Sequence, residues 1–200
     1  MGKTVFFDLG NVLIFFSHKR MCRQLSDVLS LKMETVYDFL FKSTLADDYE
    51  LGKISTNDLY NQLTSLTKNN VPYFDVLHAV SNIFQPNPAI IPLLEKLKAK
   101  GTKLVILSNT CEAHYNYASS HFPHLKLFDD KILSYEVGLR KPDPNIFNRA
   151  ILKAKTTVDD CFYTDDMKEN VRAAKRLGIK SHTFTSTELL EEELKKLEFI

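Results

Sequence analysis

The sequence is poor in cysteine, with only Cys22, Cys111 and Cys161 in 200 residues. Their number is odd and no two of them stand in a C-x-x-C pair, so the pattern indicates neither a disulfide framework nor a structural zinc site. Reduced thiols are typical of the cytoplasm, which is the compartment that we expect.

An excess of charge and a long hydrophobic run are also missing. Lysine and arginine number 26 against 25 acidic residues, so no net field would hold nucleic acid, and a small molecule is the expected partner. The apolar run at residues 4–7 breaks at Asp8, which makes it too short for a signal peptide or a membrane span. We expect a monomer with no membrane or nucleic-acid partner.

What the sequence does contain is an alternation of apolar strands and amphipathic helices. Hydrophobic residues make up 44% of the chain, enough for one sizeable core. Helical stripes, two of which end at Gly101 and Gly178, separate five short runs. The runs predicted as strands are Thr4–Phe7, Lys103–Leu107, Lys131–Ser134, Cys161–Tyr163 and Ser181–Phe184. The alternation predicts an α/β fold: a doubly wound parallel sheet of five strands with helices on both faces.

One long interval, from about residue 17 to residue 84, contains helical patterns but no convincing strand. It lies between the first and second strands, so it leaves the sheet at the carboxyl edge, where open parallel sheets bind ligands. We predict a core domain of residues 1–16 and 85–200 and an inserted helical cap domain of residues 17–84 that acts as a lid. Gln85–Pro92 is the expected hinge. Substrate selection is expected near Glu50–Lys53, although these residues also fit a helix-ending turn.

Aspartates follow two of the predicted strands. Asp8 ends the first run, and of four Asp-Asp pairs only Asp165-Asp166 follows an apolar strand rather than preceding one or lying in the insertion. Carboxylates gathered at one edge repel each other unless a divalent cation neutralises them, and oxygen ligands with water suit magnesium. Each aspartate also fits a helix N-cap, so the pattern alone leaves both interpretations open.

Polar residues follow two further strands. Ser108 and Asn109 end the second strand, where a hydroxyl and the N–H groups of a helix start can hold phosphate oxygens. Lys141 lies in the loop GLRKPDP after the third strand, and its ammonium can balance phosphoryl charge. Helix capping and a solvated lysine are the alternative interpretations.

Four segments taken together resemble a known family. FFDLGNVL, LVILSNT, GLRKPDPNIF and YTDDMKEN occur in the order, and at roughly the spacing, of the four signature motifs of the haloacid dehalogenase (HAD) superfamily. The motifs and the strands between them cover the chain outside the insertion. The resemblance implies a HAD-like Rossmannoid sheet of strand order 5-4-1-2-3, in which Asp8 faces the Asp165-Asp166 pair, together with a small helical cap.

The resemblance also implies a reaction and its residues. Asp8 would be the nucleophile of a magnesium-dependent phosphatase and would pass through an aspartyl-phosphate. Catalysis would also use the Ser108 hydroxyl and the Lys141 ammonium. The implied magnesium site consists of Asp8, the backbone carbonyl of Gly10, Asp165 and Asp166, of which Asp166 is the more direct ligand of the pair. The implied phosphate contacts come from Ser108, Asn109 and Lys141.

Gly10 departs from the pattern of the family's phosphatases, most of which have an aspartate there to protonate the leaving oxygen. Because such groups are worth roughly 10²–10⁴-fold in rate, an ester with a less basic leaving group is the better substrate. DLGN-type members resemble bacterial sugar 1-phosphate phosphatases, so we expect a small phosphorylated metabolite such as a sugar 1-phosphate. His18 and His114 are candidate replacements for the proton donor, although an ordinary structural role is commoner for a histidine.

Two other functions stay open. In a 2-haloacid dehalogenase Asp8 would attack carbon and the halide would need no proton, but dehalogenases of the family lack the acidic pair found here at 165 and 166. A catalytically weak or inactive HAD-fold binding protein would also explain Gly10. Cys111 and His114 are spaced like a nucleophile and a base, but no oxyanion hole or orienting group accompanies them, so Cys111 is predicted to be a packing residue.

Overall fold

The centre of the molecule is a parallel sheet of five strands, seen in a computed structural model that describes residues 2–200. The strands are β1 (Thr4–Phe7), β4 (Lys103–Ser108), β5 (Asp130–Leu133), β6 (Cys161–Asp165) and β7 (Lys180–Thr183). They lie in the order β5-β4-β1-β6-β7 and every neighbouring pair is parallel. Numbered along the chain and read from the β7 edge, this is the order 5-4-1-2-3, so the predicted fold class is confirmed.

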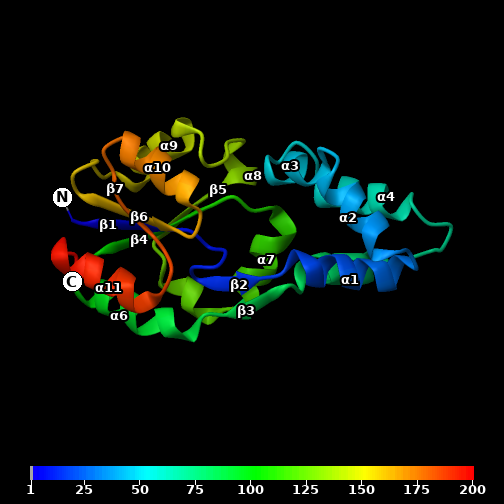
Figure 1. Cartoon of the computed structure of the whole chain (residues 1–200), viewed down its shortest axis with the longest axis horizontal. Helices are drawn as coiled ribbons and strands as arrows, with labels where there is room; N and C mark the ends of the chain where they lie inside the picture. Colours follow the sequence, from blue (N-terminus) through cyan, green and yellow to red (C-terminus); the bar gives the residue numbers. More distant parts are fainter. Residues whose placement is uncertain (1) are drawn as a thin grey trace.

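Side chains alternate along the strands and divide the core between the two faces of the sheet. Phe6 and Tyr163 pack on one face, against α9 (Pro144–Ala154) and α10 (Lys168–Arg176). Phe7 packs on the other face, where the helices are α6 (Ile91–Ala99), α7 (Glu112–His121) and α11 (Thr187–Lys196). Figure 1 shows α9 and α10 above the sheet and α6 and α11 below it. Both faces are therefore covered, as a parallel sheet requires.

Local signals set several helix ends. Ser55 begins α4 with a capping box, in which its hydroxyl accepts from the Asp58 N–H while the Asp58 carboxylate accepts from the Ser55 N–H. Gly101 and Gly178 follow α6 and α10 in the left-handed conformation, at φ 75° and 83°. No helix within residues 2–200 combines the length and the hydropathy needed to cross a membrane.

The predicted insertion is a group of helices that projects from the carboxyl edge of the sheet (Figure 1). Its helices are α1 (His18–Leu29), α2 (Met33–Phe41), α3 (Leu45–Glu50), α4 (Thr56–Thr64) and α5 (Tyr73–Ser81). The chain enters and leaves it through β2 (Ile14–Phe16) and β3 (Phe84–Pro86), which pair antiparallel. This ribbon was not predicted from the sequence, and its second strand, β3, includes the start of the stretch Gln85–Pro92 that was expected to be a hinge. Three short elements complete the chain: η1 (Pro88–Ile90), η2 (Pro123–Leu127) and α8 (Ser134–Val137).

The turn after α3 brings the insertion against the core at Gly52. This glycine has φ 68°, and a Cβ atom built on it would lie 2.1 Å from the Tyr135 carbonyl oxygen of α8. A backbone oxygen cannot rotate out of the way as a side chain can. Only glycine fits this turn without displacing one of the two segments.

We expect Gly52→Ala to destabilise the protein through both strain and this clash. Gly101→Ala is the matched control, because Gly101 has φ 75° and open space around it, so it isolates the strain alone. That strain costs about 1–2 kcal/mol, and Gly52→Ala should cost at least about 1 kcal/mol more. Urea denaturation of both variants measures the difference, and equal losses would contradict a tight contact at Tyr135.

Candidate functional site

Three aspartates from two strands meet at the carboxyl edge of the sheet. Asp8 directly follows β1, and Asp165 is the last residue of β6, which pairs with β1. One carboxylate oxygen each of Asp8, Asp165 and Asp166 lies within 4.8 Å of the others. Asp8 and Asp166 line a cavity of about 270 Å³, together with Ser108 from the end of β4. The strand order thus brings together carboxylates that are far apart in the sequence.

The Lys141 ammonium is buried among these carboxylates. Its side chain is 1% exposed, and Nζ donates to Asp8 Oδ1 and Asp165 Oδ2, both at 2.7 Å. The third donor reaches the Leu107 carbonyl oxygen at 2.9 Å, so every N–H of the ammonium is used. Burial alone would lower the pKa of Lys141, but the charges of Asp8 and Asp165 raise it above its ordinary value. The lysine is therefore a fixed positive charge in the site.

Asp165 is held by a dense set of donors. Oδ1 accepts from the Met167 N–H at 2.7 Å, Oδ2 accepts from the Tyr163 hydroxyl, and the Asn170 amide reaches both oxygens at 3.1 Å. Burial would raise the pKa of Asp165, but Lys141 and these hydrogen bonds lower it below its ordinary value. With both oxygens occupied, Asp165 positions Lys141 and is poorly placed to bind a ligand directly.

Asp166 is more open than Asp165, and among residues 2–200 one side chain forms a hydrogen bond with its carboxylate. The Asn11 amide donates to Asp166 Oδ2 at 3.0 Å. Asn11 has φ 55°, a left-handed conformation that asparagine tolerates better than most residues. This turn after β1 therefore points its side chain at the end of β6, a contact that the sequence analysis did not anticipate.

The charges around Asp8 are out of balance. Burial raises the pKa of Asp8 to about 7; Lys141 opposes this shift and the nearby charge of Asp165 adds to it. One ammonium cannot neutralise three carboxylates, so a further cation at this edge would keep Asp8 ionised. Carboxylate oxygens with room for water ligands beside them are the donors that magnesium prefers, and Asp8 and Asp166 line the cavity of about 270 Å³. The residues present therefore fit a magnesium ion.

The predicted phosphate contacts divide into two kinds. Ser108 is buried at the end of β4 and its hydroxyl lines the cavity, where it donates weakly to the Asn109 carbonyl at 3.3 Å. Asn109 uses both ends of its amide on the Lys141 backbone, accepting from the N–H at 2.8 Å and donating to the carbonyl at 2.9 Å. Asn109 therefore fixes the loop that carries Lys141, a role that its motif position alone did not reveal.

Gly10 has an aromatic ring where a longer side chain would lie. A Cβ atom built on Gly10 would be 2.7 Å from Cε1 of Phe16, which comes from β2. Phe16 also lines the cavity. An aspartate at position 10 would displace this ring, so the absence of a carboxylate there is matched by the packing around it.

The two histidines that the sequence offered as proton donors differ in their surroundings. Burial, with a smaller effect of nearby His18, lowers the pKa of His114 to about 4, and its Nε2 lies 3.2 Å from the Val80 carbonyl oxygen. His18 is exposed at the cavity, and its ring contacts Phe16 and Phe41 at centroid distances of 4.9 Å. Partial burial lowers the pKa of His18 as well. Both imidazoles line the cavity, but His18 is exposed, whereas His114 is half-buried and its pKa of about 4 keeps it neutral at physiological pH.

Cys111 lacks the properties of a nucleophile. Its thiol is buried at the N-cap of α7, and burial raises its pKa to about 12. A neutral thiol at physiological pH is a poor nucleophile. Cys22 and Cys161 are likewise free and buried.

The insertion closes one side of the cavity with ion pairs. Arg140 of the core bonds to Glu50 at 2.9 Å and to Asp47, both from α3. Burial raises the pKa of Glu50, and Arg140 opposes that shift. Both Glu50 and Arg140 line the cavity, so the end of α3 forms a turn and also faces the space where a substrate would lie.

Named relatives resemble this chain over nearly its whole length. A sesquiterpene phosphatase of Aspergillus oryzae is 25% identical over 98% of this chain and 96% of its own. A D-ribitol-5-phosphate phosphatase of Bacteroides thetaiotaomicron is 24% identical over 90% of this chain and 91% of its own. A HAD family enzyme of the same bacterium, solved with magnesium and inorganic phosphate, superposes with a TM-score of 0.83 at 23% identity, covering 92% of this chain and 95% of that one.

The family of this chain is shown by a match that extends over more than half of the sequence. The profile of haloacid dehalogenase-like hydrolases matches residues 78–184, which is more than half of the chain. The matched segment runs from the end of α5 through β4, β5, β6 and β7 and includes Ser108, Lys141, Asp165 and Asp166. The sheet order and this match lead to one conclusion: the chain belongs to the haloacid dehalogenase-like hydrolase family.

Proposed function

We propose that this protein is a magnesium-dependent phosphatase that hydrolyses a small phosphorylated metabolite through an aspartyl-phosphate on Asp8. The observation that carries the proposal is the buried Lys141 ammonium, bonded at 2.7 Å to both Asp8 and Asp165 beside the cavity. A fixed cation there suits a phosphoryl group, whose charge must be compensated during transfer. The names of two full-length relatives, both phosphatases, support the same reaction class.

In the proposed reaction an Asp8 carboxylate oxygen attacks phosphorus as the bond from phosphorus to the ester oxygen breaks. The electron pair of that bond stays on the leaving oxygen, which takes a proton from water. Lys141 orients Asp8 and balances charge, and the Ser108 hydroxyl donates to a phosphoryl oxygen. Water then attacks the phosphorus of the aspartyl-phosphate as the bond from phosphorus to the Asp8 oxygen breaks. Inorganic phosphate is released, a proton of the attacking water passes to solvent, and the Asp8 carboxylate is restored.

The residues that would hold magnesium are Asp8, Asp166 and the backbone of Gly10, with Asp165 supporting them through Lys141. When bound, the ion would supply positive charge for the phosphoryl oxygens and for ionised Asp8. Asn11 would keep Asp166 in place through its hydrogen bond of 3.0 Å. The solved relative that contains magnesium and inorganic phosphate supports this choice of metal.

The substrate that we propose is a sugar 1-phosphate or an ester of similar leaving-group basicity. The cavity of about 270 Å³ suits a small molecule, and the insertion closes over it through Glu50 and Arg140. Phe16 fills the space beside Gly10 where a carboxylic acid would protonate the leaving oxygen. A less basic leaving oxygen needs that proton less, which favours an anomeric phosphate over a primary-alcohol phosphate.

A magnesium-supported screen of phosphate esters tests the proposal. Glucose 1-phosphate should be hydrolysed with kcat/KM about 10²-fold or more above that of glucose 6-phosphate, since the missing acid is worth roughly that factor. Ribitol 5-phosphate, a primary-alcohol ester, should behave like the 6-phosphate. Removal of magnesium with a chelator should abolish turnover of all three.

Other outcomes point elsewhere. Equal turnover of the two glucose phosphates would contradict the argument from leaving-group basicity but not the phosphatase reaction. A protein that binds magnesium and phosphate yet turns over no ester, including p-nitrophenyl phosphate, would indicate a binding protein, for which Phe16 beside Gly10 is the structural argument. Chloride release from 2-chloropropionate in the presence of chelator would indicate a dehalogenase.

A further inference from the structure

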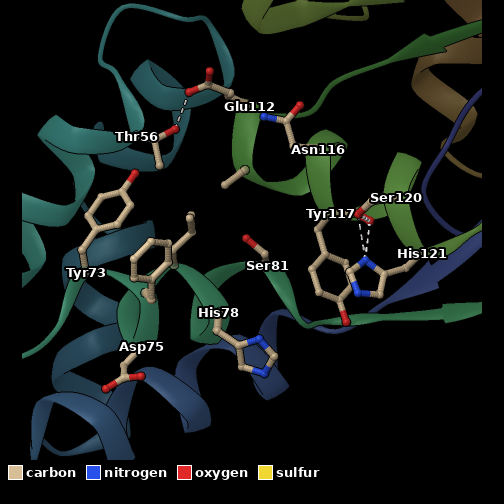
Figure 2. A pocket seen from close by; sticks show the side chains of 13 residues that line it. Thr56, Tyr73, Asp75, His78, Ser81, Glu112, Asn116, Tyr117, Ser120 and His121 are labelled. Atoms are coloured by element: carbon tan, nitrogen blue, oxygen red, sulfur yellow. Dashed lines mark hydrogen bonds between the residues drawn. The ribbon is translucent and has the colours of Figure 1, made fainter.

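A second and larger cavity, of about 730 Å³, lies where the insertion meets α7. We call it the α5/α7 pocket; it is lined by residues of α5 and α7 and by Thr56 of α4 (Figure 2). It shares no lining residue with the cavity at Asp8. Along α7, His114 faces the cavity at Asp8, whereas Ala113 and Asn116 face the α5/α7 pocket. Its volume is in the range of small-molecule sites, and the proposed phosphatase reaction does not use it.

Three phenyl or phenol rings, of Tyr73, Phe74 and Tyr117, form part of the wall of the α5/α7 pocket. Tyr73 and Tyr117 stand on opposite sides of the pocket in Figure 2, and Phe74 also lines it. The Phe74 side chain is 79% exposed, although a phenyl ring gains by burial. His121 stacks flat on Tyr117, with centroids 3.9 Å apart and an angle of 9° between the rings, so Tyr117 is held rigidly. Such rings present negative faces that attract a cation.

The charged side chains of the α5/α7 pocket have one sign. Its lining includes Asp75 and Glu112 but neither lysine nor arginine. Within residues 2–200 neither carboxylate forms an ion pair. The Thr56 hydroxyl donates to Oε2 of Glu112, as Figure 2 shows, which leaves the charge of Glu112 without a cation.

An unpartnered hydroxyl also points into the α5/α7 pocket. Ser81 is only 4% exposed, and among the described residues its Oγ has no hydrogen-bond partner. Figure 2 shows this hydroxyl directed towards the middle of the pocket, across from Glu112. A buried polar group without a partner is unfavourable, so a ligand that forms a hydrogen bond to Ser81 removes that cost and binds more tightly.

We propose that the α5/α7 pocket binds a small organic cation with an aromatic body and a hydrogen-bonding group at its far end. The ammonium group faces Glu112, the ring packs among Tyr73, Phe74 and Tyr117, and the far polar group bonds to Ser81. The Glu112 carboxylate favours a positively charged ligand, and the aromatic side chains favour a ligand with a flat ring. A phosphorylated metabolite fits poorly, because its charge has the same sign as Glu112 and Asp75.

Calorimetric titration of the full chain with four probes tests this site at about pH 8, above the ordinary titration range of histidine. Tyramine carries an ammonium group, an aromatic ring and a phenolic hydroxyl. Tyrosol has no positive charge, and 3-(4-hydroxyphenyl)propionate carries a negative charge instead. Phenethylamine keeps the ammonium group but lacks the phenolic hydroxyl. Tyramine should bind about fivefold more tightly than tyrosol, as for a half-exposed ion pair, and the propionate should bind most weakly. Phenethylamine should bind about fivefold more weakly than tyramine.

Two variants assign the probe contacts. Glu112→Gln should lower the affinity for tyramine about fivefold and leave the affinity for tyrosol unchanged. Glu34→Gln is the matched control, because Glu34 also lies in the first turn of a helix, is exposed and lines neither the α5/α7 pocket nor the cavity at Asp8; it should leave all four affinities unchanged. Ser81→Ala should lower the affinity for tyramine to that for phenethylamine. It should not lower the thermal stability of the free protein.

Clear results would overturn the proposal. These are equal affinities for tyramine, tyrosol and the propionate, a tyramine affinity that Glu112→Gln leaves unchanged, or displacement of tyramine by inorganic phosphate with magnesium. The last result would place the amine in the cavity at Asp8. All of these readouts are binding constants, so they stand apart from whether the protein proves to be a phosphatase.

Discussion

Asp8→Asn is expected to lower turnover of p-nitrophenyl phosphate with magnesium on the order of 10⁴-fold or more, because an amide oxygen is a far weaker nucleophile than a carboxylate. The same substitution should leave the free energy of unfolding unchanged or higher. Burial raises the pKa of Asp8 to about 7, which means that the folded protein disfavours its charged form. The asparagine amide oxygen can still accept from Lys141. A steady-state assay and a urea denaturation curve measure the two effects separately.

Asp159→Asn is the control for this prediction. Asp159 is exposed in the turn before β6 and should tolerate the same chemical change with no effect on rate or stability. Rapid acid quench followed by mass spectrometry should detect one phosphoryl group on the wild-type protein and none on Asp8→Asn. Turnover by Asp8→Asn within about tenfold of the wild type would contradict a nucleophilic role for this residue.

The main sheet is the part of the fold that the sequence predicts best. Its three inner strands are short apolar runs, buried on both faces, and such runs are visible without tertiary information. The edge strands start one residue earlier than predicted, at Asp130 and Lys180, because these polar residues pair with Val105 and Phe162 of the neighbouring strands. Strand starts depend on that pairing, which hydrophobicity alone does not reveal.

The ribbon of β2 and β3 is the part that sequence analysis missed. Each strand has three residues, too few to show a period of two, and Phe15 is 42% exposed. Their pairing joins Phe16 to Phe84 across the whole inserted helical segment. Only the packing of that segment brings them together. The consequence for the site is direct, because this ribbon carries the ring of Phe16 to Gly10.

In the site, the sequence identified charged groups but not what holds them. Asp8, Asp165 and Asp166 lie at or just after the ends of strands, where the motifs identify them, and the structure places their oxygens together. Asn11 and Asn170 form hydrogen bonds with the acidic pair. Neither was predicted as a site residue, since an asparagine in a turn or helix is usually solvated. Side-chain partners across strands are a property of the assembled fold.

Lys141→Met is expected to lower the free energy of unfolding by about 3–5 kcal/mol, the range for removing one partner of a buried ion pair. Asp8 and Asp165 would then face each other without the ammonium that each contacts at 2.7 Å. Urea denaturation at neutral pH measures the loss. The loss should shrink as the pH falls, because a carboxyl group whose pKa is raised in the folded state takes up a proton there and relieves the repulsion.

A second substitution separates charge repulsion from lost packing. Asp8→Asn in the Lys141→Met background should recover part of the lost stability, because only one buried carboxylate then remains beside the methionine. Lys42→Met is the matched control. The Lys42 side chain is 66% exposed in its ion pair with Asp38, so this substitution should leave the free energy of unfolding nearly unchanged. If the double variant were no more stable than Lys141→Met alone, the packing and hydrogen bonds of Lys141 would outweigh its charge. Lys141 would then have mainly a structural role. The position of its ammonium between the two carboxylates would no longer support a role in balancing phosphoryl charge.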